Sequence, residues 1–105
     1  MGGGTLANPW HWDSGLDANG KLIGVDVTWN SATRALVSAT AHRDTGCLYT
    51  KIFIGLGPDG TPNTSPEVFD LTGFTGSKTF SATQMASVGL HTIDDIISTQ
   101  ITAGT

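Results

Sequence analysis

Cysteine is almost absent from this chain. Cys47 is the single cysteine among 105 residues, so no disulfide can form within the chain. Small secreted domains with a limited core are usually held together by several disulfides. A domain of about 100 residues buries more than roughly 60% of the surface of its unfolded chain, enough for one core without cross-links. The sequence therefore predicts a single core that needs no covalent support.

Charged residues are also scarce. They make up 13% of the chain, and the five lysines and arginines are outnumbered by nine acidic residues, which leaves a net charge of -4. Proteins that bind nucleic acids or anionic membranes present basic surfaces, because they neutralise phosphate groups. We therefore expect neither a nucleic acid nor a membrane as a partner.

Long apolar runs are missing as well. No stretch approaches the roughly 20 apolar residues of a membrane-spanning helix, and no basic segment followed by an apolar run near Met1 marks a signal peptide. The abundance of threonine and glycine is typical of exposed β proteins. We expect a location on a virion or an extracellular surface, without a recognisable signal peptide.

Catalytic and metal-binding motifs are absent too. His11, His42 and His91 are scattered, without the His-Glu-x-x-His spacing of zinc enzymes. Cys47 lies five residues after His42, a spacing that allows a nucleophile and its base. However, a lone cysteine at the start of an apolar run is more often a core residue. We expect a non-enzymatic protein with no cofactor.

Alternating apolar and polar residues between Lys21 and Leu56 are the strongest signal that is present. This period of two is typical of strands with one buried face. We expect strands over 22–29, 35–42 and 47–56, joined by a hairpin loop at 30–33 and a turn at 43–46. In the third strand, Leu48 shares the face of Ile52, opposite Phe53. The inward faces predict a core of Ile23, Val25, Val27, Val37, Ile52 and Ile54.

The segment Asp17-Ala18-Asn19-Gly20 precedes the first of these strands. Asn-Gly before a strand is typical of a type I′ hairpin turn, which needs positive φ at both residues. Asp17 and Asn19 also have the spacing of ligands in a calcium loop that would end at Asp26, but the first ligand position is Gly15. The turn is the favoured interpretation, and a calcium site at Asp17, Asn19 and Asp26 is the alternative.

The second half of the chain is less regular. The proline-rich segment 57–66 predicts a surface loop, 67–71 a short strand and 72–77 a turn. Ser81 is placed to cap a short helical turn near residues 82–88, which Gly89 would end in the left-handed conformation. The isoleucines over 93–103 favour a final strand. A helix-hairpin-helix element over 84–93 is the alternative, although its basic residues are missing.

Short strands separated by turns predict a single all-β domain over residues 13–105, arranged as a β-sandwich or jelly roll. Residues 1–12 are expected to form an extended N-terminal arm, glycine-rich up to Pro9. Trp10 and Trp12 point to the same side of such a segment. They could cover the protein's own core, pack on a neighbouring subunit, or stack on a sugar.

The segment Gly89-Leu90-His91-Thr92-Ile93-Asp94-Asp95-Ile96, in a β-rich chain, resembles small structural and decoration proteins of tailed bacteriophages. The resemblance implies a structural component of a virion and carries over no functional residues. We expect an assembly protein that forms homo-oligomers, or binds other particle proteins, through strand edges and the arm. The alternative is a carbohydrate-binding module that stacks a surface glycan on Trp10, Trp12, Trp29 and Tyr49.

Overall fold

The computed structural model describes residues 10–55 and 67–105. Within these residues the chain forms seven strands and two short helices. In chain order they are β1 (Trp10–Leu16), β2 (Leu22–Trp29), β3 (Leu36–Arg43), β4 (Lys51–Ile54), β5 (Glu67–Asp70), β6 (Gly76–Ser81), α1 (Ala82–Ala86), α2 (Asp94–Ile97) and β7 (Ile101–Gly104).

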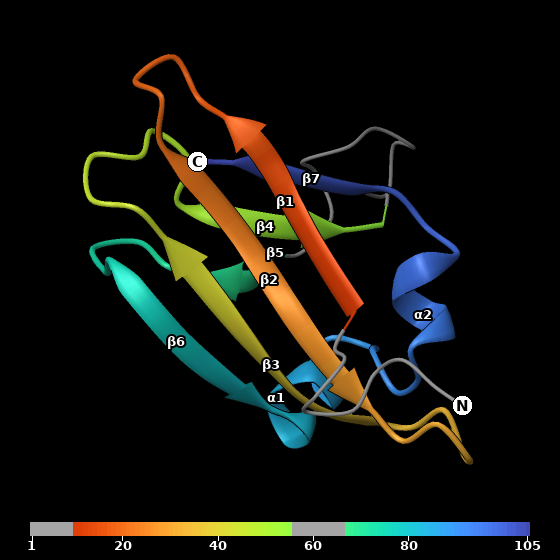
Figure 1. The fold of residues 1–105 in the computed structure, drawn as a ribbon. Helices are drawn as coiled ribbons and strands as arrows, with labels where there is room; N and C mark the ends of the chain where they lie inside the picture. The colour runs from red at the N-terminus through yellow and green to blue at the C-terminus, as the bar shows by residue number, and fades with distance from the viewer. Residues whose placement is uncertain (1–9, 56–66) are drawn as a thin grey trace.

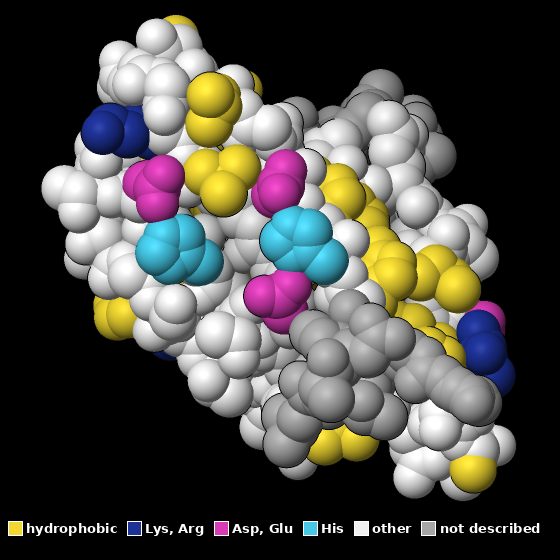
Figure 2. All heavy atoms as spheres, in the orientation of Figure 1, with side chains coloured by type: hydrophobic (Ala, Val, Ile, Leu, Met, Phe, Trp, Pro, Cys, Tyr) yellow, Lys and Arg dark blue, Asp and Glu magenta, His cyan; other side chains and the backbone are white. Residues whose placement is uncertain are grey.

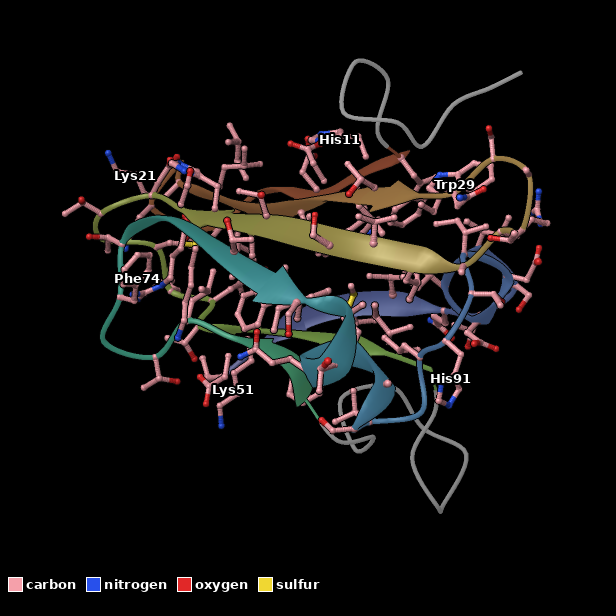
Figure 3. All side chains as sticks on the ribbon, turned by 90° about the horizontal axis from the view of Figure 1, so that it is seen from below. His11, Lys21, Trp29, Lys51, Phe74 and His91 are labelled. Atoms are coloured by element: carbon pink, nitrogen blue, oxygen red, sulfur yellow. The ribbon has the colours of Figure 1, made fainter. Side chains whose placement is uncertain are left out.

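The strands form two antiparallel sheets that pack face to face (Figure 1). One sheet has the order β1-β2-β3-β6, and the other has the order β5-β4-β7. β1 and β7 lie at one flank of the sandwich, and β6 and β5 lie at the other (Figures 1 and 3). The predicted all-β sandwich is confirmed.

The core lies between the two sheets because the inward positions of β2 and β3 are apolar and face β4 and β5. Val25 pairs with Ala41 and Val27 with Ala39, and these side chains are buried. Phe69 of β5 meets Phe80 of β6 edge to face, with ring centroids 5.0 Å apart, a favoured geometry for aromatic pairs. Five of the six predicted core residues are buried: Ile23, Val25, Val27, Ile52 and Ile54.

The prediction that Val37 lies in the core was wrong. Its side chain is 54% exposed, and its neighbour Leu36 is buried instead. The pairing of β2 with β3 shifts here, since Thr28 pairs with Ser38 while Trp29 pairs with Leu36. Val37 is the extra residue of this bulge. A bulge reverses the alternation of side chains along the strand, so the period of two failed at this point.

The third strand is shorter than predicted, and Leu48 does not share the buried face of Ile52 as expected. β4 covers only Lys51–Ile54, Leu48 is 50% exposed, and Phe53 is buried although it faces away from Ile52. The preceding residues connect the two sheets. Arg43 donates from Nε to the Tyr49 carbonyl at 2.7 Å and from Nη2 to the Cys47 carbonyl at 2.7 Å. Pairing with a strand begins only at Thr50, whose N–H donates to the Gly104 carbonyl of β7 at 2.9 Å. Leu56 lies outside the described residues.

The short helix after Ser81 is confirmed as α1. Ser81 Oγ accepts the Gln84 N–H at 3.1 Å, and Gln84 Oε1 accepts the Ser81 N–H at 2.8 Å, which completes a capping box. Gly89 follows with φ +87°, as expected for a left-handed helix end.

The predicted strand over 93–103 was wrong in its first half, where the chain forms α2 before β7 begins. Asp95 Oδ2 accepts the N–H groups of His91 and Thr92 at 2.8 and 3.0 Å, which supports a helical start. Ile93 and Ile96, three residues apart, are both buried. This is helical spacing, so the isoleucines reach the core from a helix.

The strand at 67–71 is confirmed as β5, while the predicted loop at 57–66 lies outside the described residues. The prediction of an extended arm over residues 1–12 was wrong for residues 10–12. Residues 10–12 belong to β1, which pairs with β2 within the domain. Residues 1–9 lie outside the described part of the chain.

Candidate functional site

The two tryptophans of β1 lie at the edge of the four-stranded sheet. β1 pairs with β2 on one side, and no further strand of the described residues pairs with its other side. Trp10 pairs with Val27 and Trp12 with Val25, so both indoles point toward the inner face. They are half-buried and pack against the core, as Ile101 and Ala103 of β7 do. Figure 2 shows a hydrophobic band on this flank, beside a histidine.

The other two rings of the proposed sugar platform lie elsewhere. Trp29 ends β2, where the Arg34 guanidinium lies over its ring at 5.0 Å from the centroid. Tyr49 contacts Arg43, which pairs with Ile23 near the opposite end of β2. The six residue steps from Ile23 to Trp29 span roughly 20 Å at about 3.3 Å per residue. The four rings therefore do not form one surface.

The outer face of the same sheet is polar. The strand register places two rows of residues across it, and Figure 2 shows histidine and acidic side chains gathered there. One row consists of Asp13, Gly24, His42 and Ser77, and the next consists of His11, Asp26, Thr40 and Thr79.

His11 joins β1 to β2 on this face. Its Nδ1 lies 2.5 Å from Asp26 Oδ1, and its Nε2 lies 2.9 Å from Asp13 Oδ2. The hydrogen bond to Asp13, and then the one to Asp26, raise the pKa of His11 above its usual 6.5, because both ring nitrogens donate only in the charged form. The same bond lowers the pKa of Asp13. His11 therefore lies between two carboxylates at the sheet edge, and both contacts favour its charged form.

Gly24 allows β1 to approach closely at this point. A Cβ at Gly24 would lie 2.8 Å from Asp13 Cβ and 2.8 Å from the Trp12 carbonyl oxygen. Both distances are shorter than van der Waals contact, and one of them involves backbone. Gly24 thus keeps the edge strand close to the sheet.

A second histidine that contacts a carboxylate, His42, lies on the interior strand β3. His42 Nε2 is 2.7 Å from Asp44 Oδ1, and His42 Nδ1 is 3.3 Å from Ser77 Oγ. Cys47 is buried, and burial raises the pKa of its thiol. His42 is directed to Asp44 and Ser77, so the structure does not form the Cys47–His42 pair considered from the sequence.

The structure does not bring Asp17, Asn19 and Asp26 of the calcium alternative together. Asp17 is buried, and its carboxylate accepts backbone N–H groups of Asn19 and Lys21 at 2.8 Å each and of Leu48 at 2.5 Å. The Leu48 contact is the main reason that the pKa of Asp17 is lowered. Asp26 instead contacts His11 on the outer face. In the described ranges, no three His, Cys, Asp or Glu residues are grouped to hold a metal.

The turn at Asn19-Gly20 was only partly right. Gly20 has φ +73°, but Asn19 does not have the positive φ that a type I′ turn requires. The Gly20 N–H donates to the Asp17 carbonyl at 3.0 Å, and the Asp17 N–H donates to the Lys21 carbonyl at 2.9 Å. The connection is therefore a three-residue hairpin loop with glycine in the left-handed position, the next commonest type.

β6 forms the other edge of the four-stranded sheet. Lys78 pairs with the buried Ala41, so it leaves the strand on the inner side. Its Nζ lies over the rings of Phe80 and Phe74, 5.4 and 5.9 Å from their centroids. An inward-pointing charge is a common device against pairing of an exposed edge, because a second strand would have to bury it.

The chain matches no known protein family, no curated protein and no solved structure. No helix of the described residues is long and apolar enough to cross a membrane. The features that sequence reasoning missed are the contact of His11 with Asp26 and the close approach at Gly24. Residue alternation puts the side chains of His11 and Asp26 on the faces opposite Trp12 and Val25. Only the strand register shows that His11 and Asp26 are neighbours.

Proposed function

We propose that this protein is a non-enzymatic assembly domain that self-associates through the β1 edge, as a structural component of a particle such as a virion. The observation that carries the proposal is the composition of the inner side of this edge. It presents the two half-buried indoles Trp10 and Trp12, with no charge between them on that side.

An unprotected edge strand is a template for pairing with another chain, because one row of its N–H and C=O groups has no partner strand. The indoles add apolar surface at the same place, and burying such surface stabilises association by roughly 25 cal/mol per Å². β6, at the other end of the sheet, is blocked by Lys78. The protein therefore favours association through one edge of this sheet.

The carbohydrate-binding alternative has less support. Stacking on a glycan needs ring faces exposed together on one surface. Trp29 and Tyr49 lie at opposite ends of β2, and the ring of Trp29 is already covered by Arg34.

The test is the dissociation constant of the full chain, measured by analytical ultracentrifugation over a concentration series. Trp12→Lys copies onto β1 the inward charge that Lys78 places on β6. We expect this substitution to weaken association at least about tenfold, or ~1.4 kcal/mol. Thr79→Lys is the matched control, because it adds the same charge to the outer face of the blocked edge. We expect Thr79→Lys to associate like the original chain.

Circular dichroism verifies that both variants keep the β fold. If the original chain stays monomeric at millimolar concentrations, the proposed function is wrong. It is also wrong if the two lysine variants weaken association equally, since charge alone would then explain the effect.

A further inference from the structure

We infer that the partner of the β1 edge is a second copy of this chain, paired antiparallel about a two-fold axis at Trp12. This inference rests on the proposed function, and it adds the partner, the symmetry and the residue register. Its basis is the charge pattern of β1, where His11 and Asp13 lie on the outer face two residues apart.

The geometry of a sheet leaves few registers. When two copies of one strand pair antiparallel about a two-fold axis, inward residues must oppose inward residues, or the apolar face of one copy would meet the polar face of the other. The axis must therefore pass through a residue of the strand. The regular part of β1 ends at the shift between Asp13 and Leu16, where Gly15 has φ +78°. The candidate centres are consequently His11, Trp12 and Asp13.

Charge separates the three candidates. A centre at His11 would place two imidazoles opposite each other, and a centre at Asp13 would place two carboxylates opposite each other. Like charges directly opposite one another destabilise a sheet. A centre at Trp12 places His11 of each copy opposite Asp13 of the other, which gives two attractive pairs. Only this register is self-complementary, as a two-fold interface requires.

The same register also suits the inner face. Trp12 of one copy lies opposite Trp12 of the other, and directly opposed aromatic residues stabilise neighbouring strands. Trp10 falls opposite Ser14, the last residue before Gly15. The pairing thus extends from residue 10 to residue 14 and stops where the strand bends.

Complementary charge variants test this register. Asp13→Lys places a lysine opposite His11 of the second copy, and His11→Glu places a glutamate opposite Asp13. Each variant alone should associate at least about tenfold more weakly than the original chain near pH 6, where histidine is largely charged. In an equimolar mixture, the introduced lysine of one variant opposes the introduced glutamate of the other, while the original His11–Asp13 pair is kept on the other side of the axis. The mixture should therefore recover association to within a few-fold of the original.

His42→Glu is the matched control. It replaces the same residue type beside an aspartate on the same outer face, but β3 is an interior strand. It should leave association unchanged. Thermal unfolding of each variant verifies folding, and His11→Gln takes the place of His11→Glu if the latter unfolds.

The outcomes separate the two proposals. If the original chain associates but the mixture recovers nothing, or if neither substitution weakens association, the register about Trp12 is wrong while the assembly function stands. If the original chain does not associate at all, the assembly function itself is wrong, and the register falls with it.

Discussion

The two edges of the four-stranded sheet are built differently. At β6, the inner side carries Phe80, which is buried, and Lys78, an exposed residue whose Nζ lies over the Phe80 ring. At β1, the inner side carries Trp10 and Trp12, both half-buried. β6 thus closes the core and carries an inward charge, whereas β1 covers the core only in part.

The two edges also differ in how they are attached. β6 pairs with β3 over six consecutive residues without a shift in register. β1 is regular only over its first part, and it is held by the close approach at Gly24 and by His11 between two carboxylates. How well an edge packs on the core and whether it is open to pairing are therefore separate properties, and each can be changed by substitution.

Phe80→Ala should have the largest effect on stability. Phe80 is buried and packs edge to face on Phe69, so its removal leaves a cavity between the sheets. We expect a loss of about 3–5 kcal/mol in the free energy of unfolding, measured by urea denaturation. The half-buried Trp10 is the control, and Trp10→Ala should cost clearly less. Equal losses would mean that β1 contributes as much to the core as β6.

Gly24→Ala should detach the β1 edge. The added Cβ would lie too close to the Trp12 carbonyl oxygen, so β1 must move away from β2. We expect a loss of about 1–3 kcal/mol, within the usual range for a single strained substitution. Amide hydrogen exchange should become faster in β1 and stay unchanged in β6. Faster exchange in both strands would show that the two edges are not independent.

Lys78→Val should unblock the β6 edge. The substitution removes the inward charge and adds a β-branched residue that favours strands, so a second edge becomes able to pair. With two available edges, association can continue beyond a dimer. We expect species larger than a dimer in sedimentation velocity, with an association gain of at least about tenfold, or ~1.4 kcal/mol. Lys21→Val removes the same charge just before β2 and should not produce them.

Changing pH should have the smallest effect, and it should act on β1. The pKa of His11 in the folded protein is raised above 6.5. Its charged form therefore stabilises the fold fully below about pH 6.5, and this contribution is lost as pH rises through the raised pKa. Asp13 has a lowered pKa, so its contribution is present above its ordinary 3.8 and is lost as pH falls further. Stability from this contact should be greatest between these limits.

The titration of the His11 ring proton by NMR measures the shift directly. His11→Gln should flatten the pH dependence of the urea midpoint between about pH 6 and 8, because glutamine does not titrate. A His11 pKa at or below 6.5 would contradict the contacts with Asp13 and Asp26.

Local signals in the sequence were sufficient for most individual elements. The alternation around Val25 predicted β2, and Ser81 as a capping residue predicted the start of α1, because these patterns depend on residues close together in the chain. The sandwich class followed from the number of short strands and turns.

Only the tertiary structure determined the exceptions. Val37 left the core because β3 has one more residue than β2 can pair with, and that count is a property of the two strands together. Ile93 and Ile96 are buried at helical spacing because this segment packs on the core as a helix, and that packing outweighs the β preference of isoleucine. The contrast between the edges arose in the same way. The alternation placed Trp10 and Trp12 on one side of their segment, but which strands end the sheet depends on pairing between distant segments, which local sequence does not encode.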